Sequence, residues 1–368
     1  MTRTIAAIIA VIAIAAPWAG AQAPVAEWLF DDDIEGFACT DPTAQMTSTN
    51  DANIVREEDN GVLELSYTPT KTTLVAAIGE LQEGLAGGQS LMMHLRTTDQ
   101  TIVLVGVVEA DGSSYNTAFT SLPDRWQEVA IDFAEFELGN DSTDENGQLD
   151  PDQVATIMVA DAVIMLAMMA DQVPFFVAPD LSPRMMWIDD MWVDSEGVDP
   201  RWIKTETGIQ VDSFEAAPLQ WACVAGTGLE VAYDKELKTD GNNSLRIAYD
   251  LPAGKLFIAM TGLQAVPLEG MTRLSLSYLS EVATTLLLEI EEVDGSKYST
   301  LLPVVAGDDF SQIDMALAEL TLGNDSEDEN DQLDITQAKQ LVIGDLSAMV
   351  GDPVLQNTLW LDDLSFAE

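Results

Sequence analysis

Carboxylates are the most abundant side chains in this sequence that could bind a metal or catalyse a reaction. Its 368 residues include 63 Asp and Glu against 15 Lys and Arg, which gives a formal charge of −48. Carboxylate oxygens bind calcium, and a pair of carboxyl groups serves glycoside hydrolysis as acid and base. With 63 acidic residues some pair will always have a suitable spacing, and the clearest acidic motifs occur twice, as structural features would. The sequence therefore favours calcium binding over catalysis, and we predict no catalytic residues.

Two similar segments each place an aspartate among apolar residues. If both are strands, alternation with a period of two gives each a face of four residues: Trp187, Asp189, Met191 and Val193 in the first, and Trp360, Asp362, Leu364 and Phe366 in the second. A carboxylate buried on such a face must be paired, protonated or bound to a metal, and few Lys and Arg exist to pair it. We predict metal ligation by Asp189 and Asp362, with Asp190 and Asp363 as second choices. In the alternative, these aspartates lie at strand ends, where they reach solvent or cap backbone amides.

Two acidic loops offer a second set of metal ligands: Asp141, Asp144 and Asp150 in one, and Asp325, Asp328 and Asp334 in the other. Neither loop follows the EF-hand pattern. A register that puts Gly147 at the invariant glycine puts Gln153 where a bidentate acidic ligand belongs, and the second loop replaces that glycine with Asp331. A calcium turn of another kind and a solvated acidic loop both remain open.

Polar and aromatic side chains on expected strands supply candidate ligand contacts. His94 and Arg96 alternate with apolar residues along the segment 91–96, which places both on one sheet face. Tyr115 and Tyr298 follow the Asp-Gly dipeptides at 111–112 and 294–295. We predict that these four side chains contact a ligand, and the alternative for the two tyrosines is burial in the core.

Composition excludes several classes of protein. Phosphate binding depends on Lys and Arg, so a charge of −48 argues against a nucleic-acid binder and against docking on anionic membranes. A single histidine and two cysteines argue against zinc sites and iron–sulfur clusters built from these residues. The acidity suits a saline habitat, where acidic surfaces stay solvated, and it equally suits calcium binding.

The N-terminus has the pattern of a secretory signal peptide, at residues 1–23. Arg3 precedes an apolar run from Ile5 to Ala16 that is too short to span a bilayer, and residues 21–23 (AQA) fit a cleavage site. We therefore expect an exported protein, in the periplasm, on the cell surface or outside the cell. Export permits disulfides, so Cys39 and Cys223 are candidates for one bond, with two separate thiols as the alternative.

An internal repeat organises the chain. Residues 138–142 (LGNDS) return at 322–326, a displacement of 184 that also relates Cys39 to Cys223. We predict two copies of one module, at 25–195 and 209–368, joined by a linker at 196–208. Apolar, β-branched segments such as 101–108, followed by Asp-Gly, predict strands and hairpins. One short helix is expected after each acidic loop, at 151–159 and 335–342, which makes each module a β-sandwich with one short helix.

The order of these signals resembles that of a known family. An acidic opening segment (29–36, LFDDDIEG; 213–216, SFEA) precedes strands, an Asp-Gly hairpin, a Trp-led strand, an acidic loop and a closing aromatic-x-Asp-Asp strand. The chain is similar to the galactose-binding-domain-like β-jelly rolls, most of all to family-11-type carbohydrate-binding modules and the complex I intermediate-associated protein 30 type. The resemblance implies structural calcium held by the opening acidic residue, here Asp31 and Glu215, together with the closing-strand aspartate. It also implies a sheet face that binds sugar.

The sequence thus predicts an all-β, exported, non-catalytic protein of two tandem jelly-roll modules, with structural calcium and weak binding to a glycan polymer. A structural or adhesive protein of the cell envelope or matrix, without a sugar site, is the alternative. A glycoside-active enzyme is a third, less favoured interpretation.

Overall fold

A computed structural model describes residues 23–56, 60–139, 142–215, 218–224, 229–324, 326–328, 330–350 and 356–368. The predicted signal peptide therefore lies outside the described residues, except for its last position. Within the described ranges, no helix has both the length and the apolar character needed to cross a membrane.

The first module, module 1, is built from two six-stranded sheets. Sheet 1 has the order β3 (Gln45–Thr49), β4 (Val62–Tyr67), β12 (Arg184–Asp194), β6 (Ser90–Thr97) and β9 (Gln127–Asp132), with β1 (Ala26–Trp28) also paired to β12. Sheet 2 has the order β10 (Glu137–Leu138), β8 (Ser114–Ser121), β7 (Thr101–Glu109), β11 (Val154–Asp161), β5 (Val75–Glu80) and β2 (Ala38–Cys39). Neighbouring strands run antiparallel, so connections between them can be short.

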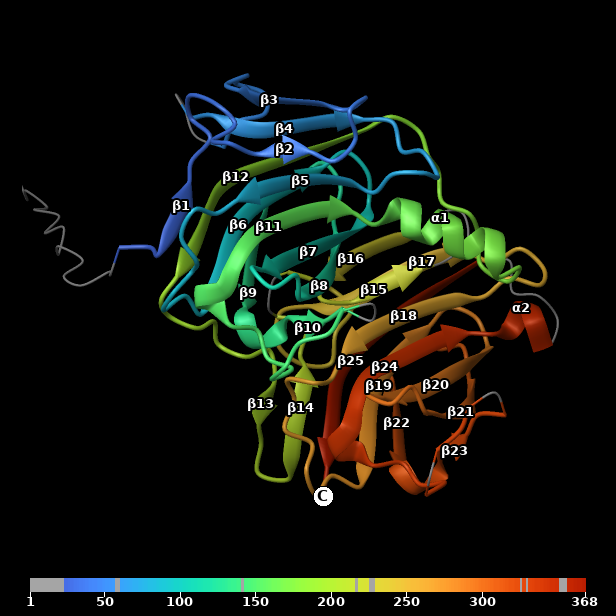
Figure 1. The fold of residues 1–368 in the computed structure, drawn as a ribbon. Coiled ribbons are helices and arrows are strands. Elements are labelled where there is room, and N and C mark those ends of the chain that lie inside the picture. The colour runs from blue at the N-terminus through green and yellow to red at the C-terminus, as the bar shows by residue number, and fades with distance from the viewer. Residues whose placement is uncertain are drawn as a thin grey trace, which may run out of the picture.

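The second module, module 2, repeats this plan. Sheet 3 has the order β13 (Ile203–Lys204), β14 (Gly208–Asp212), β25 (Gln356–Ala367), β17 (Ser244–Asp250) and β16 (Glu230–Asp234), and β19 (Arg273–Ser280) joins β25 to β22 (Ser311–Ala316). Sheet 4 has the order β15 (Ala222–Val224), β18 (Phe257–Gly262), β24 (Ala338–Asp345), β20 (Thr284–Glu292), β21 (Lys297–Val304) and β23 (Thr321–Leu322). Alternating apolar residues from the two sheets of each module meet in one core, so the predicted all-β fold of tandem sandwiches is confirmed (Figure 1).

The two short helices occur later in each module than the sequence suggested. The acidic loops are followed only by single 3₁₀ turns, η2 (Pro151–Gln153) and η4 (Ile335–Gln337), and then by the central strands β11 and β24. The predicted helices at 151–159 and 335–342 are therefore wrong, because the pattern of apolar residues in so short a segment does not distinguish a helix from a strand. The helices are α1 (Val163–Gln172) and α2 (Ser347–Val350), and two further 3₁₀ turns are η1 (Phe133–Glu135) and η3 (Leu317–Glu319).

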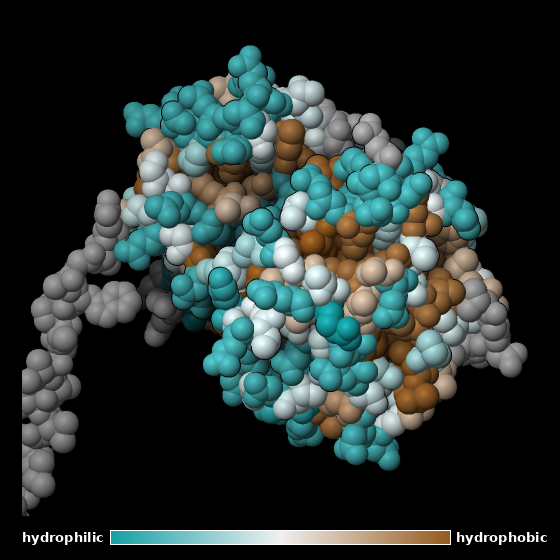
Figure 2. Space-filling model, turned by 90° about the horizontal axis from the view of Figure 1, so that it is seen from below, coloured by the Kyte–Doolittle hydropathy of each residue, from teal (hydrophilic) through white to brown (hydrophobic). Residues whose placement is uncertain are grey.

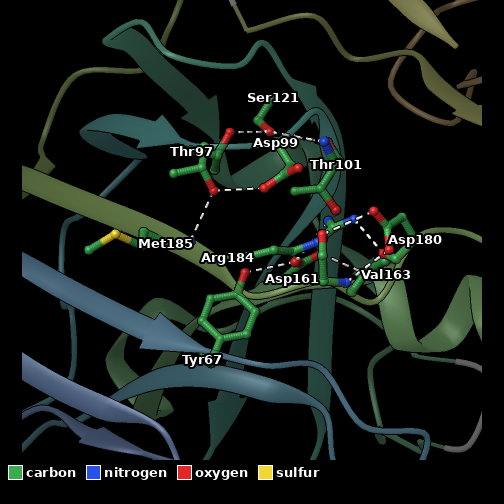
Figure 3. Close-up of polar contacts among 12 residues, drawn as sticks. Tyr67, Thr97, Asp99, Thr101, Ser121, Asp161, Val163, Asp180, Arg184 and Met185 are labelled. Carbon is green, nitrogen blue, oxygen red and sulfur yellow. Dashed lines mark hydrogen bonds and ion pairs between the residues drawn. The ribbon is translucent and has the colours of Figure 1, made fainter. Parts of the chain in front are cut away.

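A buried aspartate ends the central strand of sheet 2. Asp161 is 1% exposed, accepts a hydrogen bond of 2.7 Å from the Tyr67 hydroxyl, and lies 3.3 Å from the Arg184 guanidinium (Figure 3). Module 2 repeats the pair with Asp345 and Tyr249 at 2.6 Å. A buried carboxylate is tolerated only with such donors, so the pair fixes the passage from strand to helix in each module.

The two modules pack directly on each other (Figure 1). The backbone N–H of Thr120 in β8 donates to the Leu219 carbonyl at 2.9 Å, and the N–H of Leu256 donates to the Phe175 carbonyl at 3.1 Å. A third apolar cluster joins Ile102, Ala162 and Phe176 of module 1 to Val224 and Leu256 of module 2. Hydrophilic side chains cover much of the surface, with hydrophobic side chains gathered between them (Figure 2).

Candidate functional sites

Each closing strand contains a bulge at its paired aspartates. Asp190 and Asp363 have positive φ values of 43° and 50°, and the pairing of β12 with β6 shifts register between Asp189 and Trp192. The extra residue reverses the alternation, so Trp187 and Asp189 point away from the core whereas Met191 and Val193 point into it. The same reversal separates Trp360 and Asp362 from Leu364 and Phe366. The prediction that each set of four shares one face is therefore wrong.

Asp189 has a cation of the chain itself as its partner. Its side chain is fully buried, and Arg56 lies 3.5 Å from Asp189 and 2.9 Å from Asp190. The Asn60 amide also donates to Asp189, at 3.3 Å. Burial and the neighbouring Asp190 charge raise the pKa of Asp189 to about 6. These contacts account for the carboxylate without a metal, and metal ligation here remains a prediction.

In module 2 the hydroxyl and the backbone N–H of Thr239 take the place that Arg56 has beside the aspartate in module 1. Asp362 accepts hydrogen bonds from the Thr239 backbone N–H at 2.7 Å and the Thr239 hydroxyl at 2.8 Å, and burial raises the pKa of Asp362. Asp363 shares the single proton of this hydroxyl, whose oxygen lies 2.6 Å from its carboxylate, and also accepts from Gln210 at 2.9 Å. The alternative considered for these residues, capping of a backbone amide, describes Asp362 in the structure.

The opening acidic residues bind backbone amides. Asp31 accepts from the N–H of Gly61 at 3.0 Å, and Glu215 accepts from the N–H groups of Asn242 and Asn243 at 2.6 and 2.8 Å. Burial acts to raise the pKa of Glu215, but these hydrogen bonds outweigh it and lower the pKa. Within the described parts of the chain, neither residue forms a close carboxylate cluster with the closing-strand aspartates.

The structure instead brings carboxylates together where the Asp-Gly hairpin meets the acidic loop. In module 1 one carboxylate oxygen from each of Glu109, Asp111 and Asp144 lies within 4.8 Å of the other two. In module 2 the equivalent cluster is Glu292, Asp294 and Asp328. We call these the hairpin clusters. The second-choice residues Asp144 and Asp328 belong to them. Sequence reasoning missed the other two members of each cluster, which are the glutamate and the aspartate of the repeated Glu-x-Asp-Gly motif.

The hairpin cluster of module 1 has the chemistry of a cation site. Glu109 is 4% exposed, and burial together with the nearby Asp144, Asp150 and Asp111 charges raises its pKa, against a backbone hydrogen bond from Asp150. No ion pair recorded for the described residues involves Glu109, Asp111 or Asp144. Three hard oxygen donors in so small a volume suit calcium, which uses carboxylates and has flexible geometry.

The remaining acidic-loop residues lie beside the hairpin clusters. The backbone N–H of Asp150 donates to Glu109 at 2.6 Å, while the Asp150 carboxylate accepts from Asn146 at 2.9 Å. Asp334 caps η4 by accepting from the Thr336 N–H at 3.0 Å. Asp141 and Asp325 lie outside the described residues.

The two tyrosines support the hairpin clusters. Tyr115 and Tyr298 are each 2% exposed, and their hydroxyls donate to Asp144, at 2.7 Å, and to Asp328. Rings buried in this way cannot stack on a ligand, so the prediction that they contact one is wrong and the alternative of burial holds. The predicted disulfide is also absent, because Cys39 in β2 and Cys223 in β15 are free thiols in different modules.

His94 and Arg96 lie together on the outer face of sheet 1, as their alternation predicted. The Arg96 guanidinium stacks on Trp187 at 5.3 Å from the ring centroid, and Trp187 is 3% exposed. The His94 ring lies 6.1 Å from the ring of Trp192, a half-buried residue of β12, and 2.8 Å from Arg56. Sequence reasoning missed Trp192, because only the bulge at Asp190 turns it outward.

The corresponding face of module 2 lacks these rings. His94 of β6 pairs with Asp189 in module 1. In module 2 the equivalent Asp362 pairs with Ser277 of β19, so a serine takes the place of the histidine. Ser365 takes the position of Trp192, and Leu279 that of Arg96. The aromatic pair is therefore particular to module 1, and we call Trp192, His94 and the adjacent Arg56 and Asp190 the aromatic face.

No protein-family model matches this chain, and no curated protein matches it. Among solved structures, it is similar to the family 11 carbohydrate-binding module of a Clostridium thermocellum cellulosomal cellulase, with 11% identity, 45% of this chain and 96% of that chain covered, and a TM-score of 0.35. It is similar to a tandem pair of family 22 carbohydrate-binding modules from Paenibacillus barcinonensis, with 9% identity, 96% and 100% covered, and a TM-score of 0.29. It is also similar to a family 30 module of a C. thermocellum cellulase, with 15% identity, 42% and 95% covered, and a TM-score of 0.32.

Proposed function

We propose that this protein is an exported, non-catalytic glycan-binding protein. The aromatic face of module 1 binds the sugar, and calcium at the hairpin clusters stabilises both modules. The observation that carries the proposal is the half-buried ring of Trp192 beside His94, surrounded by charged hydrogen-bonding groups.

The aromatic face offers the two kinds of contact that a sugar ring uses. The exposed part of Trp192 provides an apolar ring surface, while its neighbours Arg56 and Asp190 provide a donor and an acceptor. Arg56 also lies 2.8 Å from His94, so these groups are held in position before a ligand arrives. Preorganisation of this kind reduces the entropy lost on binding.

Calcium is proposed at the hairpin clusters because their residues fit it. Glu109, Asp111 and Asp144 would hold the ion in module 1, and the duplicate cluster would hold a second ion in module 2. A bound divalent ion neutralises carboxylates that otherwise repel one another, and so it stabilises the native state alone.

The glycan proposal is tested with the chain from residue 24 and its Trp192→Ala variant. We expect wild-type protein to be retarded in native gels that contain soluble polysaccharides, with barley β-glucan, xylan and agarose as probes. Trp192→Ala should weaken binding by about 5- to 150-fold, since loss of one stacked ring costs about 1–3 kcal/mol. Ser365→Ala, at the equivalent position of module 2, is the matched control and should bind as wild type does.

Retention of binding by Trp192→Ala would contradict the proposed face. Calcium-dependent self-association with no retardation by any polysaccharide would instead support a structural or adhesive protein.

The calcium proposal is tested by thermal unfolding in EDTA, in calcium, and in sodium chloride of equal ionic strength. We expect calcium at 100 times its dissociation constant to add about 2.7 kcal/mol per site, beyond the salt control. Asp144→Asn and Asp328→Asn should each remove part of this gain, and the double variant should remove all of it. Equal responses to calcium and to salt would refute the sites.

A further inference from the structure

A cavity lies between the modules and is separate from the aromatic face. Its volume is about 450 Å³. Module 1 contributes the segment from η1 to β10, including Glu135 and Glu137, and the joining segment contributes Arg201 and Trp202. Module 2 contributes Gln220 and the end of β18. A cavity of this size is within the range of small-ligand sites.

One wall of the cavity is already organised by polar contacts. The Gln220 side-chain amide donates to Glu135, and the backbone carbonyl of Gln220 accepts from the Thr261 hydroxyl at 3.0 Å. Arg201 lies 3.4 Å from Asp212. Trp202 is half-buried and packs on the core of module 2, so its ring forms a fixed apolar wall.

Glu137 lines this cavity without a protein partner among the described residues. It is half-buried, and no hydrogen bond or ion pair to its carboxylate is recorded for the described residues. Lys339 influences it only through longer-range attraction, and burial raises its pKa. A half-buried acceptor that lines a cavity and has no protein donor is open to a ligand that supplies one.

The charges disfavour an anionic ligand. Asp132, Glu135 and Glu137 line the cavity together with Arg201, which also lies 3.4 Å from Asp212, so groups that accept hydrogen bonds outnumber cations there. What remains is an acceptor at Glu137, amide groups at Gln264 and Gln340, and the ring of Trp202. A hydroxyl-rich ring matches this combination of acceptor, amides and apolar wall.

We propose that the cavity between the modules is a second carbohydrate site, which binds one or two sugar units of the same glycan class through Glu137 and Trp202. This inference rests on the proposed glycan binding. It adds a site that only the pair of modules creates, because neither module lines the cavity alone.

Gly262 gives a way to fill the cavity without disturbing either core. A β-carbon added there would lie 3.4 Å from the Glu137 carboxylate and within 4 Å of no other atom beyond its chain neighbours. Gly262→Leu should therefore place its side chain in the cavity. Glu80, at the same position in the equivalent strand β5, is exposed, so Glu80→Leu is the matched control.

The experiment is isothermal titration of the chain from residue 24 with cellohexaose, xylohexaose and laminarihexaose. For the sugar that binds, we expect two binding events per chain. Gly262→Leu and Trp192→Ala should each leave one event, and the double variant none. Glu80→Leu should behave as wild type.

Glu137→Gln, which preserves shape, should weaken only the cavity event, by about tenfold. If Gly262→Leu lowers the melting temperature, Glu137→Gln still tests the cavity site without adding volume to it.

The outcomes separate this inference from the function on which it rests. One event that Trp192→Ala removes and Gly262→Leu leaves intact would overturn the cavity site alone. One event that Gly262→Leu removes and Trp192→Ala leaves intact would support the cavity and overturn the aromatic face. Absence of binding by all three sugars would count against both.

Discussion

Replacing Asp189 with asparagine should stabilise the protein in neutral, calcium-free buffer. Burial, reinforced by the Asp190 charge, raises the pKa of Asp189 from 3.8 to about 6. Between about pH 4 and pH 6 the native state therefore holds a proton that the unfolded chain has released. The free energy of unfolding consequently falls as the pH rises through this window, and the loss is complete above about pH 6.

The magnitude follows from the size of the shift. A rise of about two pKa units corresponds to about 3 kcal/mol between the two protonation states. Asparagine keeps the size of the side chain but cannot ionise, and Arg56 keeps its contact of 2.9 Å with Asp190. We expect Asp189→Asn to exceed wild type in stability by up to about 3 kcal/mol at pH 8 and to show no gain below pH 4.

The measurement is urea unfolding followed by tryptophan fluorescence at several pH values in EDTA. Asp362→Asn is the control, because Thr239 donates two hydrogen bonds to one Asp362 oxygen and the N–H of Asp363 donates to the other. An asparagine at position 362 would place its NH₂ group against the donors of Thr239 or against the N–H of Asp363. Asp362→Asn should therefore lower the free energy of unfolding at every pH. A gain for Asp189→Asn that is absent at pH 8, or that persists below pH 4, would refute the reasoning.

Three further predictions concern other buried groups. Tyr67→Phe should lower the free energy of unfolding by about 1–3 kcal/mol in chemical denaturation, because it removes a donor from the buried Asp161; stability equal to wild type would contradict this role. Calcium affinity measured by calorimetry should be weaker at pH 5 than at pH 7.5, because burial raises the pKa of Glu109 and a protonated carboxyl is a poor ligand; equal affinities would argue against ligation by Glu109. Dithionitrobenzoate should modify Cys39 before Cys223 in native protein at pH 8, because burial raises the pKa of Cys223 to about 12 while Cys39 is only partly buried; labelling of Cys223 first would contradict its burial.

The repeat and the alternation of apolar residues were enough to predict the sandwich. Segments such as 101–108 and 284–293 carry β-branched or leucine-rich runs next to Asp-Gly turns, and the structure places them as the central strands β7 and β20. The helices were misplaced because periodicity cannot distinguish a buried strand from a short buried helix. That choice depends on the neighbours β5 and β7, which lie far away in the sequence.

The sites were predicted less well because they depend on a bulge, in which one extra residue changes which side chains face the core. Strict alternation places Asp189 and Met191 on the same face, whereas the bulge at Asp190 separates them and turns Trp192 outward. No local pattern in the sequence identifies a non-glycine residue with positive φ. The repeat does show that the Asp-Asp pair with which the bulge is associated occurs in both modules. The hairpin clusters join residues about 35 positions apart, such as Glu109 and Asp144, so only the tertiary structure reveals them.

The shared apolar cluster between the modules has a consequence for how the chain can be divided. Ile102, Ala162 and Phe176 are buried against Val224 and Leu256, and the backbone bridge from Thr120 to Leu219 crosses the same boundary. Cutting the chain after β12 would expose these side chains and leave the bridge unmade, so either half alone should aggregate more readily than the whole. The sequence repeat corresponds to two similar modules, but the shared cluster makes their surfaces depend on each other. We therefore expect the pair, rather than a single module, to keep its structure when moved into another protein.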